Sequence, residues 1–122
     1  MTRKNKVLIV DDEPNIIRII KDRLEANNFE VITAANGEEG LEAAKEKPDI
    51  ILLDIMMPIV DGYDALNNLK SSNETKHIPV IMLTARGESS AVSQAFELGA
   101  ADYIVKPINP GILIDKIRQV LS

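Results

Sequence analysis

The stretch KVLIVDDEPN, residues 6–15, sets the first constraint on the fold. Four consecutive apolar residues, Val7 to Val10, run directly into two adjacent aspartates, Asp11 and Asp12. A continuous run of Val, Leu and Ile is typical of a strand that is buried on both faces of a parallel sheet. Two neighbouring carboxylates repel each other, and burial disfavours the charged form of both. We therefore expect that the pair lies in water or that a positive charge offsets the repulsion.

The length and composition indicate one globular domain spanning residues 1–122, with 45% apolar and 27% charged residues. The net charge is −5 and there is no basic cluster, which argues against direct nucleic-acid binding. The chain has no cysteine, so disulfide and thiolate chemistry are excluded. We see neither a signal peptide nor a membrane span, and we expect a cytoplasmic protein with no membrane partner.

Five short apolar runs alternate with five segments that carry helix signals. The apolar runs are Val7–Val10, Val31–Ala34, Ile50–Leu53, Pro79–Leu83 and Tyr103–Val105. The helix signals are Pro14 at a first helical position, Asn36 with Glu39 as a capping box, Asp61 as a cap and Gly99 as a terminator. The apolar stripes between them are Ile17, Ile20 and Leu24; Leu41 and Ala44; Leu66 and Leu69; Val92, Ala95 and Phe96; Leu113, Ile117 and Val120. This (βα)5 alternation predicts an α/β fold, a doubly wound parallel five-stranded sheet with helices on both faces.

Side chains that can bind a ligand or take part in a reaction lie where four of these runs end. They are Asp11 with Asp12, Asp54, Thr84 and Lys106. The carboxyl ends of parallel strands share one edge of the sheet, and ligands bind there. Three clustered carboxylates are tolerable if a divalent cation lies among them and Lys106 offsets more of the charge. Oxygen ligands without His or Cys favour Mg²⁺, or Mn²⁺ in vitro, and a carboxylate is also a possible nucleophile toward phosphorus.

Each of these residues also has a purely structural interpretation. Asp11 or Asp12 could cap the helix that starts near Pro14, and an isolated Thr84 is more often a hydrogen-bonded turn residue. Asp54 could be an ordinary loop residue, and an isolated Lys106 is usually a solvated charge or an ion-pair partner. The agreement of four strand ends favours the functional interpretation.

The residues then match a known family in four stretches, in order: VLIVDDEPN, DIILLDIMMPIVDG, IPVIMLTA and GAADYIVKP. On these motifs the chain resembles, almost end to end, the receiver domains of bacterial two-component response regulators, of the kind found in chemotaxis regulators. The resemblance implies a flavodoxin-like sheet with strand order 2-1-3-4-5. It also implies that Asp54 accepts a phosphoryl group from a sensor histidine kinase or a histidine phosphotransfer protein.

The same resemblance assigns the metal site. Asp12 binds Mg²⁺ directly, Asp11 binds it mainly through water, and Asp54 and the backbone carbonyl of Met56 complete the protein ligands. Thr84 and Lys106 hold the phosphoryl oxygens once Asp54 is modified.

The resemblance also describes a switch. Tyr103 matches an aromatic residue that moves inward when Thr84 engages phosphate, and Lys106–Pro107 matches a cis peptide bond. The surface that changes is formed by residues 92–99, the strand Tyr103–Val105 and the last helix around residues 113–120. A downstream partner, an output domain or a second copy of the chain would read that surface.

Our interpretation is a phosphorylation-controlled switch that assists its own modification and is not a turnover enzyme. One alternative is a phosphatase that forms an aspartyl phosphate, but the chain lacks a second acid two residues after Asp54, where Met56 stands. Another is a binding module with a receiver fold that does not depend on phosphorylation, which the complete set of acidic, hydroxyl and lysine residues argues against. A flavodoxin-like electron carrier would need a phosphate-binding loop where Asp11 and Asp12 stand.

The resemblance implies that two further positions set the lifetime of the phosphorylated state, because in this family their side chains flank the approach of water to the phosphorylated aspartate. They are Met56 and Arg86, two residues after Asp54 and Thr84. Met56 is apolar and cannot orient a water molecule by a strong hydrogen bond, and Arg86 is a permanent hydrogen-bond donor that cannot take a proton from that water. Both features predict slow hydrolysis. The double variant Met56→Asn with Arg86→Glu is expected to lose phosphate faster than the wild type.

Overall fold

Strands and helices alternate along the chain in this computed structural model, which describes residues 4–55, 57, 61–85 and 89–122. The strands are β1 (Lys6–Val10), β2 (Glu30–Ala34), β3 (Ile50–Asp54), β4 (Val80–Thr84) and β5 (Asp102–Val105). The helices are α1 (Pro14–Ala26), α2 (Gly37–Ala43), α3 (Gly62–Ser71), α4 (Ser89–Glu97) and α5 (Pro110–Leu121), with a short 3-10 helix, η1 (Ala44–Glu46), after α2. All five predicted strands are present, with bounds that differ from the expected ones by one residue at most.

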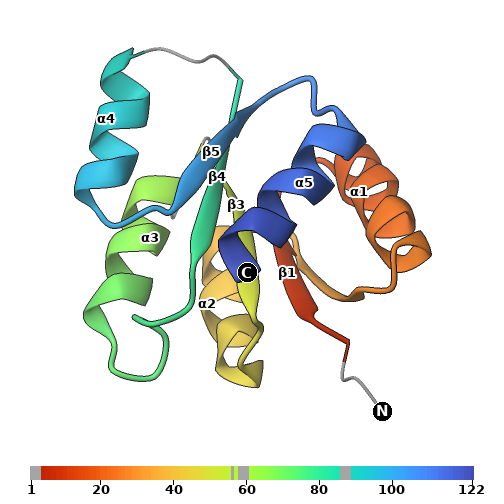
Figure 1. Cartoon of the computed structure of the whole chain (residues 1–122). Helices are drawn as coiled ribbons and strands as arrows, with labels where there is room; N and C mark the ends of the chain where they lie inside the picture. Colours follow the sequence, from red (N-terminus) through yellow and green to blue (C-terminus); the bar gives the residue numbers. More distant parts are fainter. Residues whose placement is uncertain (1–3, 56, 58–60, 86–88) are drawn as a thin grey trace.

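The five strands form one parallel sheet in the order β2-β1-β3-β4-β5. Figure 1 shows α1 and α5 on one face of the sheet and α2, α3 and α4 on the other. The predicted fold class and strand order are therefore confirmed. Every strand points its carboxyl end toward the same edge, and the connections to the following helices leave from there.

The alternation of side chains in the central strands builds two hydrophobic cores. In β1, Leu8 and Val10 join the core beneath α2 and α3, whereas Val7 and Ile9 join the core beneath α1 and α5. β3 is buried along its whole length, as expected for the middle strand of a sheet covered on both faces. The sheet is consequently a rigid platform for the residues at its carboxyl edge.

The predicted helix boundaries have the expected local chemistry. Asn36 accepts a hydrogen bond from the backbone N–H of Glu39 at 2.8 Å, and Asp61 accepts one from that of Asp64 at 2.9 Å. Gly99, at φ +104°, follows α4 in the left-handed region that glycine adopts without strain. The caps fix where α2 and α3 start, and therefore how the loops at the carboxyl edge run.

Two predicted stripe positions differ in the structure. Ala44 is buried as expected, but it begins η1 instead of continuing α2. The apolar periodicity predicts Phe96 in the buried stripe of α4, but its side chain is 45% exposed. The helical period places Phe96 near the edge of that stripe, and its ring packs on Tyr103 instead of entering the core.

Among the described residues, no helix is long and apolar enough to cross a membrane.

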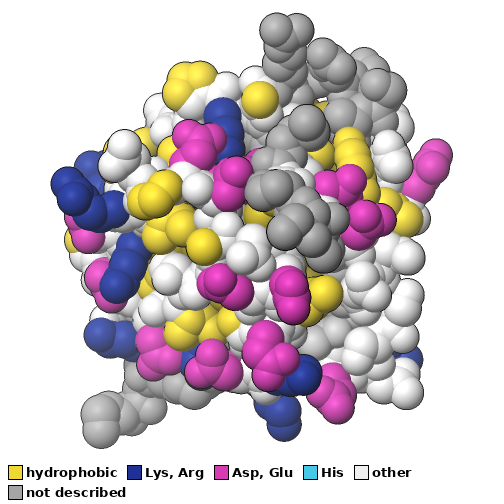
Figure 2. All heavy atoms as spheres, turned by 180° about the vertical axis from the view of Figure 1, so that it is seen from behind, with side chains coloured by type: hydrophobic (Ala, Val, Ile, Leu, Met, Phe, Trp, Pro, Cys, Tyr) yellow, Lys and Arg dark blue, Asp and Glu magenta, His cyan; other side chains and the backbone are white. Residues whose placement is uncertain are grey.

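Figure 2 shows Asp and Glu side chains spread over the face seen from behind, with Lys and Arg side chains between them.

Candidate functional site

The carboxyl edge of the sheet gathers the predicted site residues from four strands. Asp11 directly follows β1, Asp54 is the last residue of β3, Thr84 is the last residue of β4, and Lys106 directly follows β5. The backbone N–H of Lys106 donates to the carbonyl oxygen of Thr84 at 2.6 Å, which ties the ends of β4 and β5 together. Residues far apart in sequence therefore meet because their strands end at one edge.

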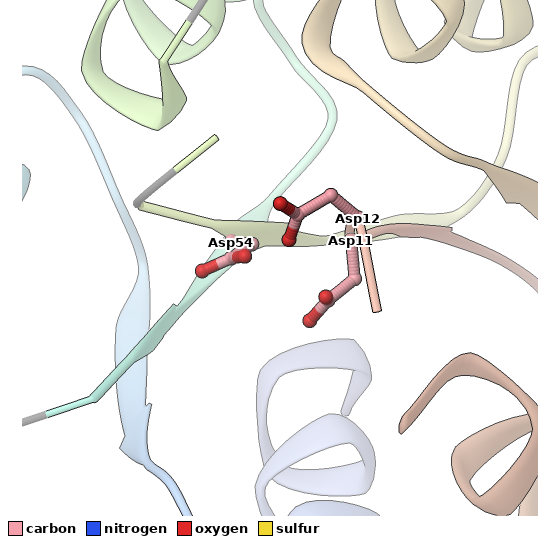
Figure 3. A group of neighbouring side chains, drawn as sticks. All are labelled: Asp11, Asp12 and Asp54. Carbon is pink, nitrogen blue, oxygen red and sulfur yellow. The ribbon is translucent and has the colours of Figure 1, made fainter. Parts of the chain in front are cut away.

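Three carboxylates converge at this edge, as Figure 3 shows. Asp11, Asp12 and Asp54 each offer an oxygen, and these oxygens all lie within 4.8 Å of one another. Asp11 is fully buried and Asp54 is 4% exposed, whereas Asp12 is exposed to solvent. Two buried carboxylates at this separation repel strongly unless cations lie between them.

Lys106 is the cation that faces this cluster. Its Nζ lies 3.0 Å from Asp11 Oδ2 and 3.5 Å from Asp54 Oδ2, and it donates a hydrogen bond of 3.4 Å to Glu13 Oε1. Burial alone would lower the pKa of Lys106, but the Asp11, Asp54 and Glu13 carboxylates outweigh burial, so its pKa is raised. The lysine therefore stays charged.

Lys106 contacts two of the three aspartates, Asp11 and Asp54. Within the described part of the chain, buried Asp11 Oδ2 has no hydrogen-bond partner, and its 3.0 Å contact with Lys106 is an ion pair without hydrogen-bond geometry. A buried carboxylate oxygen without a hydrogen bond, whose counter-ion Lys106 also contacts Asp54, fits a hard divalent cation such as Mg²⁺, which prefers such oxygens. The donor set Asp11, Asp12 and Asp54 therefore suits this metal.

The structural role proposed for the aspartates is only partly seen. The N-cap of α1 is Glu13, and no side chain caps that helix. Asp11 Oδ1 instead accepts a hydrogen bond from the Glu13 backbone N–H at 2.9 Å. Asp11 thus orders the start of α1 with one oxygen and faces Lys106 with the other.

Tyr103 lies on β5 away from the carboxylates. The ring is edge-on to that of Phe96, with centroids 6.2 Å apart, and Lys116 Nζ lies 5.4 Å from its centroid. Lys116 also pairs with Asp102 at 3.0 Å. Tyr103 is paired with Met82 in the sheet, two residues before Thr84. The structure therefore places it between α4 and α5, on the surface predicted to change.

The Lys106–Pro107 peptide bond is cis. Met56, with its carbonyl ligand, and Arg86 lie outside the described residues, so the metal ligand and lifetime roles expected of them remain predictions.

Sequence reasoning missed two residues of this region. A Cβ atom on Gly62 would lie 2.3 Å from the backbone oxygen of Asp54, so only glycine lets α3 start against the end of β3. The signal was a glycine directly after the predicted cap Asp61. The second is Glu13, which directly follows the two aspartates in the chain and contacts Lys106.

The chain is similar to known proteins in both sequence and fold. Residues 7–118 match the family model of the response regulator receiver domain. The chain is 47% identical over 120 residues to a "Probable transcriptional regulator ycf27" of Pyropia yezoensis, covering 98% of this chain and 48% of that protein. It is 43% identical over 117 residues to "Transcriptional regulatory protein CpxR" of Escherichia coli K12, covering 96% and 49%.

Among solved structures, chemotaxis protein CheY4 of Vibrio cholerae superposes with a TM-score of 0.93 at 32% identity, covering 98% of this chain and all of that one. The chain spans about half the length of the transcriptional regulators that it matches.

Proposed function

The chain belongs to the response regulator receiver domain family of two-component signalling, and we propose that it is a switch controlled by phosphorylation of Asp54. Receiver domains are signalling domains that pair with histidine kinases and bind Mg²⁺ at an acidic pocket. The observation that carries the proposal is the position of Asp54. It is 4% exposed, within 3.5 Å of Lys106 Nζ and in one cluster with Asp11 and Asp12.

The proposed reaction is a phosphoryl transfer. A carboxylate oxygen of Asp54 forms a bond to phosphorus while the P–N bond to the donor histidine breaks, and the electron pair of that bond leaves with the imidazole nitrogen. Mg²⁺ held by Asp11, Asp12 and Asp54 would neutralise charge on the phosphoryl oxygens. Lys106 adds a fixed positive charge on the side of Asp54 that it already contacts.

The proposed output follows from the added charge. A phosphoryl group gives Asp54 new acceptor oxygens, for which the hydroxyl of Thr84 and the ammonium of Lys106 are the expected donors. A shift of Thr84 would change the packing of β5, where the Tyr103 ring lies between Phe96 and Lys116. The surface of α4, β5 and α5 would then change its affinity for a partner.

The proposed partners are a histidine kinase or histidine phosphotransfer protein as donor, and an output domain or a second copy of the chain as reader. The transcriptional regulators that the chain matches are about twice its length, which supports an output domain as one reader. The domain itself is proposed to assist its own phosphorylation and dephosphorylation without turning over an external substrate.

The test is direct labelling. Incubation with phosphoramidate and Mg²⁺ should add one phosphoryl group, seen as a shift in intact mass. Asp54→Asn should abolish the shift, because an amide oxygen is a poor nucleophile. Asp22→Asn, an exposed position on α1, is the matched control and should label like the wild type. Unchanged labelling of Asp54→Asn would overturn the assignment.

A further inference from the structure

Glu13 breaks a local rule at the start of α1. It is the N-cap residue, a position where Ser, Thr, Asp and Asn are favoured because their short side chains accept a backbone hydrogen bond. The Glu13 side chain makes no such bond, and its own backbone N–H is satisfied by Asp11. Capping therefore does not explain a glutamate here, and departures of this kind concentrate at functional sites.

The side chain of Glu13 reaches Lys106 instead. Their Oε1 and Nζ atoms are 3.4 Å apart in a hydrogen bond, and the Glu13 side chain is 58% exposed while that of Lys106 is 14% exposed. Asp11 and Asp54 contact the same ammonium from the buried side. Lys106 is thus held from the solvent side by Glu13 and from the sheet side by the two aspartates.

The charges identify Glu13 as the surplus anion. A divalent cation and Lys106 together neutralise Asp11, Asp12 and Asp54, and Glu13 is outside the group of carboxylates placed to hold a metal. When a cation engages the aspartates, their attraction for Lys106 weakens, whereas that of Glu13 does not. Glu13 then competes for the ammonium that an incoming phosphoryl group needs.

We propose that Glu13 is a positioning residue that holds Lys106 in a resting place and competes with the phosphoryl group on Asp54 for its ammonium. This role rests on the proposed phosphorylation of Asp54, and it means that Glu13 slows that phosphorylation. Breaking the Glu13 contact frees Lys106 to follow the phosphoryl oxygens. The site would therefore label faster without this carboxylate.

A second explanation for Glu13 is favourable interaction with the positive N-terminal end of α1. That role predicts a lower melting temperature for Glu13→Gln and no dependence on Lys106. The proposed role instead predicts that Glu13→Gln changes the rate of labelling and that this change requires Lys106.

The experiment measures initial rates of labelling with phosphoramidate at saturating Mg²⁺. Glu13→Gln is expected to label about two- to fivefold faster than the wild type, the range for one partly exposed ion pair. Glu38→Gln removes a charge from the first turn of α2, at the same edge of the sheet, and should leave the rate unchanged. In a Lys106→Met background, Glu13→Gln should have no effect.

Three results would overturn the inference. They are an unchanged or slower rate in Glu13→Gln, the same acceleration by Glu38→Gln, and the same acceleration in the Lys106→Met background. The last two would show that only general repulsion of the anionic donor had been relieved.

Mg²⁺ titration calorimetry gives a second measurement that needs no phosphoryl donor. Glu13→Gln should weaken Mg²⁺ binding more in the Lys106 background than in Lys106→Met, because the freed ammonium settles on the aspartates. Equal weakening in both backgrounds counts against the inference. Failure of the wild type to label, with this coupling intact, would overturn the proposed function and leave Glu13 as the residue that positions Lys106.

Discussion

At the amino edge of the sheet Asp49, Lys6 and Glu30 form local pairs, whereas at the carboxyl edge Asp11, Asp54 and Glu13 all contact one lysine, Lys106. Asp49, just before β3, accepts a hydrogen bond from the Lys6 backbone N–H at 2.7 Å and donates its own N–H to the Lys6 carbonyl. The Lys6 ammonium pairs with Glu30 at 3.6 Å. At the carboxyl edge, by contrast, Asp11 and Asp54 both contact the ammonium of Lys106.

The two edges also treat a lysine differently. Burial lowers the pKa of Lys70, whose Nζ donates to the carbonyl oxygens of Lys76 and Ile78 near the start of β4. Carbonyl groups satisfy that ammonium but add no full negative charge. At Lys106, carboxylates overcome the same effect of burial and raise the pKa. The contacts at the amino edge therefore stabilise the fold, whereas the carboxyl edge carries an excess of negative charge that can bind a cation.

The largest effect is expected from closing the space beside Asp54. Gly62→Ala would place a Cβ atom 2.3 Å from the Asp54 backbone oxygen, so the start of α3 must move. We expect a loss of about 1–3 kcal/mol in the free energy of unfolding, measured with urea, and slower labelling of Asp54. Gly111→Ala in α5 is the control, because its Cβ would meet only the Asn109 side chain at 3.3 Å. Equal stability of the two variants would contradict the close approach.

The next largest effect is expected on Mg²⁺ affinity, which should depend on the carboxyl edge and not on the amino edge. Asp12→Ala removes an exposed carboxylate from the cluster and is expected to weaken Mg²⁺ binding by about tenfold or more. Asp49→Ala at the amino edge should lower stability without changing Mg²⁺ affinity. Isothermal titration calorimetry measures both affinities, and a similar loss in the two variants would show that the metal site lies elsewhere.

Stability without metal should move in opposite directions at the two edges. Asp54→Asn removes one of the repelling charges and is expected to raise the free energy of unfolding by about 1 kcal/mol at low salt. Asp49→Asn weakens a charge-assisted hydrogen bond and should lower it by about 1 kcal/mol. Added Mg²⁺ should raise the melting temperature of the wild type more than that of Asp54→Asn. Destabilisation by Asp54→Asn in the absence of metal would mean that Lys106 alone offsets the repulsion.

The smallest effect is expected on the surface of α4, β5 and α5. Beryllofluoride with Mg²⁺, a mimic of the phosphoryl group, should shift the amide resonances of Tyr103 and its neighbours. Three apolar side chains of this surface, Phe96, Val105 and Ile112, are 45%, 39% and 52% exposed and should report the change. Signals at Lys6 and Lys70 should stay in place. Perturbation confined to the residues around Asp54 would argue against a coupled switch.

Local sequence patterns were enough to predict most of the fold. Apolar runs of four or five residues define strands buried on both faces, and caps such as Asn36 and Asp61 define helix starts, because both depend on nearest neighbours in the chain. Phe96 was misplaced because periodicity alone does not distinguish the centre of an apolar stripe from its rim. The ring of Tyr103, from another element, decides where it packs.

The sequence by itself determined which side chains stand at the carboxyl ends of the strands, since strand direction and strand ends follow from the alternation of elements. It also supplied three aspartates and one lysine there. Only the tertiary structure decided how they share charge: that Asp11 Oδ2 is buried without a hydrogen bond, that Gly62 lies against Asp54, and that Glu13 contacts Lys106. Those facts depend on distances between residues up to 93 positions apart in the chain, which no local pattern encodes.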